Sequence, residues 1–179
     1  MQNQKRKRRI IYNVTVWLLT FFWLCIIFYF SSMPSSKSDE QTSFVISLLN
    51  NLFGIETSQG ELVEKFGILQ SIDFFVRKTA HLTEYAVLGV LSFLSFKELS
   101  LMFQRRRLFQ MSASLLFCLV YAASDEIHQM FVPGRSAMVR DVLIDFCGSV
   151  IGVGVCLIIA LIYDKIRNYN NSQCLMRNS

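Results

Sequence analysis

The sequence predicts an all-α integral membrane protein, a four-helix transmembrane bundle with an amphipathic outer segment between the first two spans. Hydrophobic residues make up 53% of the 179-residue chain and charged residues only 17%, whereas an average soluble domain carries about 25% charged residues. The charges are missing mainly from long uninterrupted stretches. Lipid offers the backbone no hydrogen-bond partner, so such stretches must be helical. We expect a single domain over residues 1–179.

The first predicted span covers residues 10–30, where 21 successive residues carry no charge. At about 1.5 Å per residue, this stretch is long enough to cross a hydrocarbon core of about 30 Å. It exceeds the core of a signal peptide, about 7–15 residues, and no A-x-A-like site follows, so we expect an uncleaved helix. The other predicted spans are 79–96, 108–124 and 142–163.

An amphipathic outer segment is predicted between the first two spans, in residues 31–78. Its apolar residues recur at helical spacing, with Ser, Thr and Asn between them. The segment either lies in the plane of the membrane interface or packs on the bundle, and the sequence leaves both alternatives open. The apolar positions are Phe44, Val45, Leu48, Leu49 and Leu52, followed by Leu62, Phe66, Leu69 and Val76.

Basic residues are distributed unequally between the two sides of the predicted bundle. With both termini in the cytoplasm, 12 of the 18 Lys and Arg residues fall in cytoplasmic segments and six in outer segments. The positive-inside rule therefore favours a multi-pass protein with both termini cytoplasmic. The run Lys5–Arg9 lies directly against an apolar span, so we interpret it as a membrane anchor and expect no nucleic-acid partner.

Small residues indicate how the last span packs. Gly148, Gly152 and Gly154 leave one side of the helix smooth, and small residues allow helix backbones to approach closely in a membrane. The five cysteines include no CxxC pair and none lies in a predicted outer loop. We therefore expect neither a disulfide framework nor a zinc ribbon.

Three clusters of polar residues border the predicted spans. An ionisable group inside a span costs at least about 2.5 kcal/mol, so its presence indicates a function or a structural pair. The predicted topology brings all three clusters to the outer membrane face, which predicts a polar pocket opening to the outer leaflet. In the structural alternative, buried ion pairs such as Lys78 or Arg135 with Asp141 or Glu84 only lock the helices together. The clusters comprise Lys78, His81, Glu84 and Tyr85; Asp125, Glu126, His128 and Gln129; and Arg135, Asp141 and Asp145.

The same residues resemble the VanZ-like family, in an order that covers all four spans. The resemblance implies a small protein of about four helices in the bacterial cell membrane. The named member of that family contributes to resistance to the lipoglycopeptide teicoplanin, and members carry either Asn or Asp where this chain has Asp145. The residues that carry the resemblance are Phe30-Ser31-Ser32, Lys78-x-x-His81-x-x-x-Tyr85, Asp125-Glu126-x-x-Gln129-x-x-x-Pro133-x-Arg135, and Asp141, Asp145, Gly148 and Gly152.

The residue types of the pocket suggest an anionic ligand. Arg135 and Lys78 can bind a phosphate or a carboxylate, and Arg does so bidentately. Gln129 and Tyr85 can add neutral hydrogen bonds. We therefore expect membrane lipids as partners, with a lipid headgroup, a polyprenyl-linked cell-wall precursor or a lipoglycopeptide in the pocket, and teicoplanin tolerance as one outcome.

An intramembrane enzyme acting on a cell-envelope lipid is the second hypothesis. His81 with Asp125 or Glu126 forms a possible general base oriented by a carboxylate. Alternatively, His81, Glu84 and His128 offer ligands for a metal. The chain has only two histidines, no HExxH and no G-x-S-x-G motif, so we expect neither a metal ion nor another cofactor, and no catalytic residue is assigned.

Overall fold

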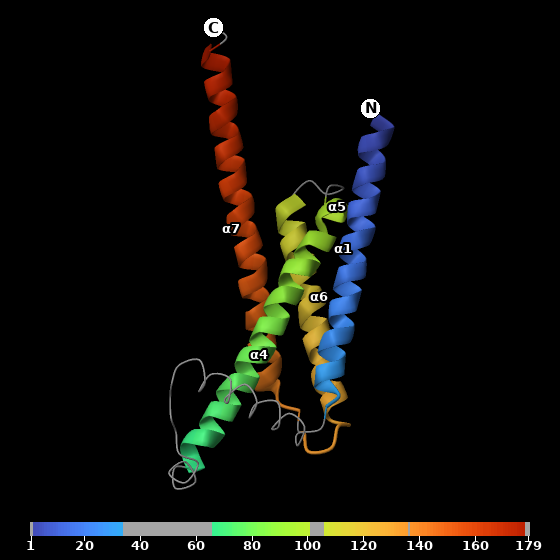
Figure 1. Cartoon of the computed structure of the whole chain (residues 1–179), viewed down its shortest axis with the longest axis vertical. Coiled ribbons are helices and arrows are strands. Elements are labelled where there is room, and N and C mark those ends of the chain that lie inside the picture. Colours follow the sequence, from blue (N-terminus) through green and yellow to red (C-terminus); the bar gives the residue numbers. More distant parts are fainter. Residues whose placement is uncertain (1, 34–65, 101–105, 136, 178–179) are drawn as a thin grey trace, which may run out of the picture.

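The structure of the protein, a computed structural model, describes residues 2–33, 66–100, 106–135 and 137–177. Helices are the only regular elements of this part of the chain, and it contains no strand, which confirms the predicted all-α class. The predicted amphipathic outer segment lies largely outside the described residues. The helices are α1 (Gln2–Ser31), α4 (Phe66–Ser95), the one-turn α5 (Lys97–Ser100), α6 (Arg106–Gln129) and α7 (Val139–Arg177) (Figure 1).

Three helices are long and apolar enough to cross a membrane: α1, Arg107–Gln129 of α6 and Val139–Gln173 of α7. Large apolar side chains on their outer faces are exposed, among them Leu18 and Phe21 of α1. A helix that is apolar all round requires apolar surroundings, such as those inside a membrane. Helix α4 covers residues 79–95 of the predicted span 79–96, and its passage through the membrane stays a prediction.

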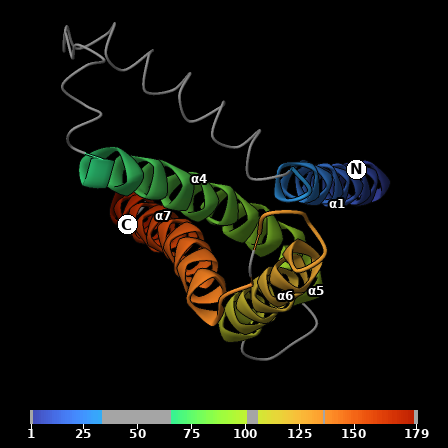
Figure 2. The same cartoon turned by 90° about the horizontal axis from the view of Figure 1, so that it is seen from below.

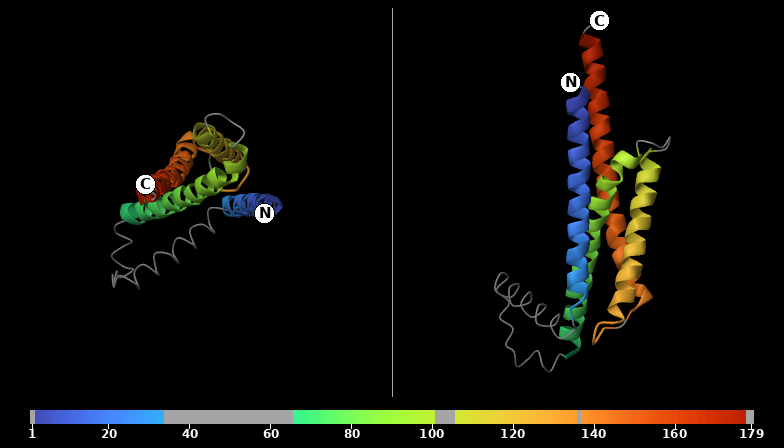
Figure 3. Two further views of the ribbon diagram at one scale, coloured as in Figure 1. Left: turned by 90° about the horizontal axis from the view of Figure 1, so that it is seen from above. Right: turned by 90° about the vertical axis from the view of Figure 1, so that its right-hand side faces the viewer.

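Helix α4 holds the bundle together. It makes its most extensive contacts with α7 and also packs against α1 and α6. Viewed along the bundle, α4 passes between α1 on one side and α7 on the other (Figure 2). The two chain termini lie at one end, which we call the terminal end (Figures 1 and 3). The opposite end, which we call the loop end, contains the last turn of α1 and residues 77–85, 125–135 and 138–145.

A compact group of side chains from α1, α4 and α6 forms the core. Because lipid is as apolar as these side chains, their association in a membrane depends on close packing and on interhelical hydrogen bonds. Both are present: the indole Nε1 of Trp23 donates to the carbonyl oxygen of Glu84 at 2.9 Å. The core residues are Ile27, Tyr85, Leu88, Cys118 and Ala122.

Glycines bring α4 and α7 into backbone contact. A Cβ atom at Gly148 would overlap the carbonyl oxygen of Leu82, and one at Gly152 would overlap that of Ala86. These two glycines pack as predicted. Gly154 does not take part, because a Cβ atom there would meet nothing within 4 Å; it lies two residues beyond Gly152 and faces away from α4.

The helices extend beyond the predicted spans. Helix α6 continues to Gln129 rather than ending near 124, so the whole second polar cluster is helical. Helix α1 includes the basic run Lys5–Arg9, and α7 continues to Arg177. High hydropathy marks only the part of a helix that can lie in lipid. The backbone hydrogen bonds of the helix continue through the polar residues on either side of that part. Four cysteines, Cys25, Cys118, Cys147 and Cys156, are free.

Candidate functional site

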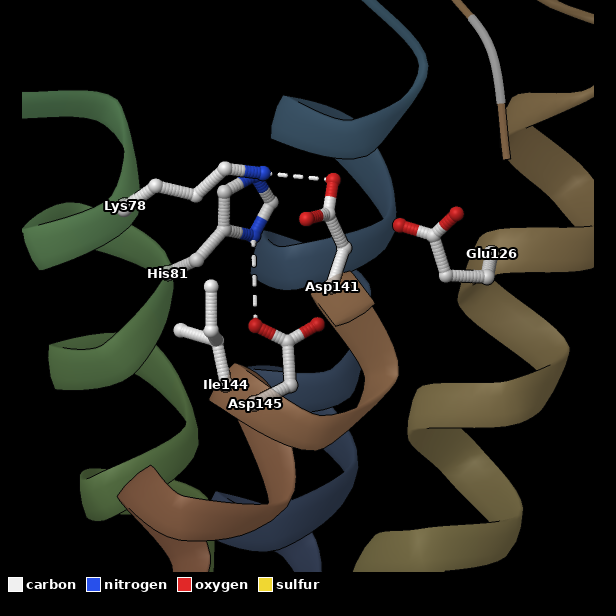
Figure 4. Close-up of a pocket in the computed structure, with 6 residues that line it drawn as sticks. All are labelled: Lys78, His81, Glu126, Asp141, Ile144 and Asp145. Carbon is white, nitrogen blue, oxygen red and sulfur yellow. Dashed lines mark ion pairs between the residues drawn. The ribbon is translucent and has the colours of Figure 1, made fainter. Parts of the chain in front are cut away.

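A polar pocket lies at the loop end, between α4, α6 and α7 (Figure 4). Helical spacing explains how the residues converge. Lys78 and His81 are separated by three residues on α4, and Asp141 and Asp145 by four on α7, so each pair shares a helix face. The pocket encloses about 180 Å³, part of it open to the surroundings. Its lining residues are Lys78, His81, Glu126, Asp141, Ile144 and Asp145.

An ion pair crosses the mouth of this pocket. The ammonium Nζ of Lys78 lies 2.5 Å from Oδ2 of Asp141, and both side chains are largely buried. Asp141 also occupies the first turn of α7, where the helix dipole favours a negative charge. The pair therefore joins α4 to α7, as one form of the predicted structural alternative requires.

His81 faces two carboxylates without forming a hydrogen bond to either. Its Nδ1 lies 3.8 Å from Oε2 of Glu84 and 3.9 Å from Oδ1 of Asp145, beyond the hydrogen-bond range. This nitrogen is buried and has no hydrogen-bond partner among the described residues. Asp125 completes the group: one ligand atom each from His81, Asp125 and Asp145 lie within 4.8 Å of one another.

The acidic residues of α6 are anchored to the rest of the loop end. The backbone N–H of Met138 donates to Oε2 of Glu126 at 3.0 Å, which ties the loop before α7 to α6. The Nε2 of Gln129 donates to Oδ2 of Asp125 at 3.1 Å and to Oγ of Ser31 at 2.8 Å. Gln129 therefore links the cluster to the end of α1.

Arg135 lies in the loop between α6 and α7, outside the set of pocket-lining residues. Gly134 precedes it with a φ of 77°, a left-handed conformation that glycine adopts without strain, so the chain turns sharply at this point. The guanidinium of Arg135 donates to the carbonyl oxygen of Phe30 at 3.5 Å, and its buried Nε has no hydrogen-bond partner in the part of the chain that the structure describes. Burial lowers the pKa of Arg135 and the neighbouring Arg77 acts in the same direction, while nearby carboxylates oppose them.

Two predicted site residues lie deeper in the bundle. Tyr85 is fully buried in the core, and its hydroxyl has no hydrogen-bond partner among the described residues. Glu84 is only partly exposed and lies beside His81. Both follow Lys78 and His81 along the same helix, so the polar cluster continues inward from the pocket.

The structure brings most of the predicted residues together, with differences in detail. His128 does not join His81 in a metal-binding group: its Nε2 lies 3.0 Å from Oγ of Ser32, and its ring stacks on Phe28. Sequence reasoning missed Ile144 as a lining residue and gave Ser31 no role in the pocket. Their side chains carry no signal of their own, because an isoleucine or a serine at a helix end is common in any membrane helix.

Comparison with known proteins supports one relationship. The family model VanZ/LLP1 matches residues 16–160, which include the second half of α1, the pocket and more than half of α7. No curated protein and no solved structure matches the chain. The matched region contains all the residues that carry the resemblance in the sequence, and it covers well over half of the chain. The chain therefore belongs to the VanZ-like family.

Proposed function

We propose that this protein binds the phosphate-bearing headgroup of an envelope lipid at the loop end, with Arg135 as the principal anion-binding residue. The observation that carries the proposal is the state of the Arg135 guanidinium. Among the described residues it donates one long hydrogen bond, to the carbonyl oxygen of Phe30, and its buried Nε donates none. A guanidinium presents five N–H donors in a planar fork, and two phosphate oxygens would satisfy that fork bidentately.

The surroundings of Arg135 suit a lipid rather than a soluble anion. Helices α6 and α7 are both apolar enough to cross a membrane, so the loop that joins them lies at a membrane surface. Large apolar side chains on either side of this loop are exposed, including Phe131 at 80% and Val139 at 79%. A cation framed by exposed apolar side chains matches the boundary between lipid headgroups and acyl chains.

The size of the neighbouring pocket limits the ligand. Its empty volume of about 180 Å³ already includes space open to the surroundings, whereas sites that enclose a whole drug-sized molecule measure roughly 300–1,000 Å³. The pocket is therefore too small to enclose an entire lipoglycopeptide. A polyprenyl-linked cell-wall precursor combines a phosphate with a lipid tail, and binding of such a precursor would connect this site to teicoplanin tolerance.

One observation favours the structural alternative, in which buried ion pairs only lock the helices together. The Lys78–Asp141 pair is close and largely buried, so these two side chains satisfy each other and join two helices. Arg135 has no comparable pair with a described carboxylate within 4.0 Å. Helix locking therefore accounts for Lys78 and leaves the guanidinium of Arg135 without an explanation.

Titration of the detergent-solubilised protein with defined lipids, followed by native mass spectrometry, tests the proposal. We expect polyprenyl phosphate to bind in preference to phosphatidylcholine, and Arg135→Ala to weaken that binding at least about tenfold, or 1.4 kcal/mol. A parallel titration with phosphatidic acid shows whether the site requires a polyprenyl tail. The matched control is Arg140→Ala, because Arg140 belongs to the same end of the molecule and its side chain is 61% exposed. Equal binding by the Arg135→Ala and Arg140→Ala variants would contradict the proposal.

A further inference from the structure

We infer that His81, Asp125 and Asp145 bind a divalent metal ion, with Zn²⁺ or Mn²⁺ as the chemical class that their donor atoms suit. The three residues come from α4, α6 and α7, and one ligand atom of each lies within 4.8 Å of the other two. The inference goes beyond the proposed function, since its ligands do not include Arg135. It also replaces the expectation from the sequence that no metal is bound.

Unsatisfied buried atoms mark the place of the ion. The Nδ1 of His81 and the Oδ1 of Asp125 are both buried without a hydrogen-bond partner among the described residues. Asp125 is only 3% exposed and Asp145 only 2%. More than about 90% of buried polar atoms in proteins have a partner, and an unoccupied ion site is one recognised reason for exceptions. Two such atoms within one group of potential ligands point to the same missing partner.

The separation of His81 and Asp145 is closer to that of two ligands of one ion than to that of a hydrogen-bonded pair. At 3.9 Å, the Nδ1 of His81 and the Oδ1 of Asp145 are too far apart to share a proton. Zinc binds nitrogen and oxygen ligands at about 2.0–2.2 Å in a tetrahedral arrangement, which places ligand atoms about 3.3–3.6 Å apart. A contraction of a few tenths of an ångström would bring this pair to the required separation.

The charge of the surrounding cluster favours a dication. Five carboxylates and three basic side chains act on one another here, so the cluster carries a charge of −2 when the acids are ionised and His81 is neutral. A divalent ion balances that charge. The residues counted are Glu84, Asp125, Glu126, Asp141, Asp145, Arg77, Lys78 and Arg135.

The donor set selects among metals. One imidazole nitrogen with carboxylate oxygens suits zinc or manganese, whereas Ca²⁺ takes six to eight oxygen ligands. Three protein ligands leave a fourth tetrahedral position open, and His81 and Asp145 both line the pocket. That position would face the pocket, where it could receive a phosphate oxygen of the ligand; this last step rests on the proposed function.

Glu84 lies next to the three proposed metal ligands. Its Oε2 lies 3.8 Å from the Nδ1 of His81, close enough to complete the coordination or to orient the ligands. Residues that orient metal ligands typically change metal affinity by about 10–100-fold when they are replaced. We therefore expect Glu84→Gln to weaken metal binding less than replacement of His81 does.

Metal analysis of the full-length protein, purified without a polyhistidine tag, tests the inference. After chelator treatment, calorimetric titration with ZnCl₂ or MnCl₂ is expected to show about one site per chain for at least one of the two ions, and His81→Gln and Asp145→Asn to weaken it at least about 100-fold. His128→Gln is the matched control, because the only other histidine pairs with Ser32 and is not in the group. Titration with Co²⁺ adds a spectroscopic check, because tetrahedral coordination by protein ligands gives a visible absorption band much stronger than that of Co²⁺ in water.

Several results would overturn the inference. The first is binding of neither ion by the wild-type protein, and the second is equal binding by His81→Gln and His128→Gln. If the variants fail to fold, the wild-type protein alone decides. The absence of both a thermal shift with Zn²⁺ or Mn²⁺ and a Co²⁺ absorption band would then contradict the site. Arg135→Ala should retain the metal. Loss of lipid binding and loss of metal binding are therefore separable outcomes.

Discussion

The buried polar groups at the two ends of the helix bundle differ in their hydrogen bonding. At the terminal end, the hydroxyls of Thr20 and Ser95 lie 2.9 Å apart and bridge α1 and α4. The side chain of Gln110 donates to the carbonyl oxygen of Phe93 at 2.6 Å, and Ser114 donates to the carbonyl oxygen of Gln110. These side chains act as internal connections between or within helices.

At the loop end, several buried polar atoms have no hydrogen-bond partner among the described residues. Towards the terminal end, the buried atom in this state is Oδ1 of Asn13. Since interhelical hydrogen bonds are one of the main forces that hold membrane helices together, polar groups kept out of such bonds indicate another purpose. This difference between the two ends supports the proposal that the loop end binds a partner from outside the chain. The unpartnered atoms there include His81 Nδ1, Tyr85 Oη, Asp125 Oδ1, Arg135 Nε and Asp141 Oδ1.

The largest expected effect comes from comparing one ion pair at each end. Lys78→Met removes the partner of Asp141, whose side chain is only 17% exposed, so we expect the free energy of unfolding to fall by about 2–3 kcal/mol. Arg107→Met breaks the pair with Asp164 near the terminal end, where both side chains are more than 40% exposed, and should cost at most about 1 kcal/mol. Thermal and chemical unfolding in detergent measure both. Equal losses would show that the two pairs do not differ in burial as the structure indicates.

The glycine contacts fix how α4 and α7 are placed against each other. Gly148 and Gly152 hold the two backbones in direct contact, so the helices cannot rotate freely to form new hydrogen bonds between polar atoms at the loop end. We expect Gly152→Ala to lower the free energy of unfolding by about 1–3 kcal/mol, because its Cβ would overlap the carbonyl oxygen of Ala86. Gly154→Ala, with open space around its Cβ, is the matched control and should be neutral. If both substitutions are neutral in unfolding experiments, α4 and α7 are free to adjust.

The sequence predicted three helices that are apolar enough to cross a membrane, because absence of charge is a local property. Residues 10–30 carry no charge, and any lipid-facing helix needs such a stretch. The ends of the helices were predicted less well. Helix α6 continues through Asp125 and Gln129, since ionisable residues end a hydrophobic stretch without ending a helix.

The candidate site was predicted as a set of residues but not as a set of pairs. Helical spacing shows that Lys78 and His81 share a face of one helix, but not how neighbouring helices are rotated. For that reason the sequence left Lys78 with several possible acidic partners, of which the structure selects Asp141. For the same reason His128 was considered beside His81, whereas the structure brings Asp125 and Asp145 there instead.

Glycine packing also depends on how neighbouring helices are rotated, which the sequence does not show. The sequence could not separate Gly152 from Gly154, although only the former contacts α4. It also gave no role to Gly89, where a Cβ atom would lie 2.5 Å from the carbonyl oxygen of Ser149. A small residue signals a possible close approach, and the partner helix decides which small residue is used.

Two neighbouring tyrosines give the most direct test of the contrast, with the smallest expected effect. The rings of Tyr85 and Tyr121 are 6.3 Å apart, but their hydroxyls differ. That of Tyr121 donates to the carbonyl oxygen of Leu24 at 2.7 Å, and that of Tyr85 has no hydrogen-bond partner within the described ranges. Tyr121→Phe should therefore cost about 1 kcal/mol of unfolding free energy, whereas Tyr85→Phe should be neutral or stabilising in metal-free protein, because it removes a buried hydroxyl that makes no bond. Unfolding of both variants before and after chelator treatment is the measurement. A loss for Tyr85→Phe as large as that for Tyr121→Phe in metal-free protein would mean that the Tyr85 hydroxyl is already bonded within the chain, and the loop end would then be satisfied internally like the terminal end.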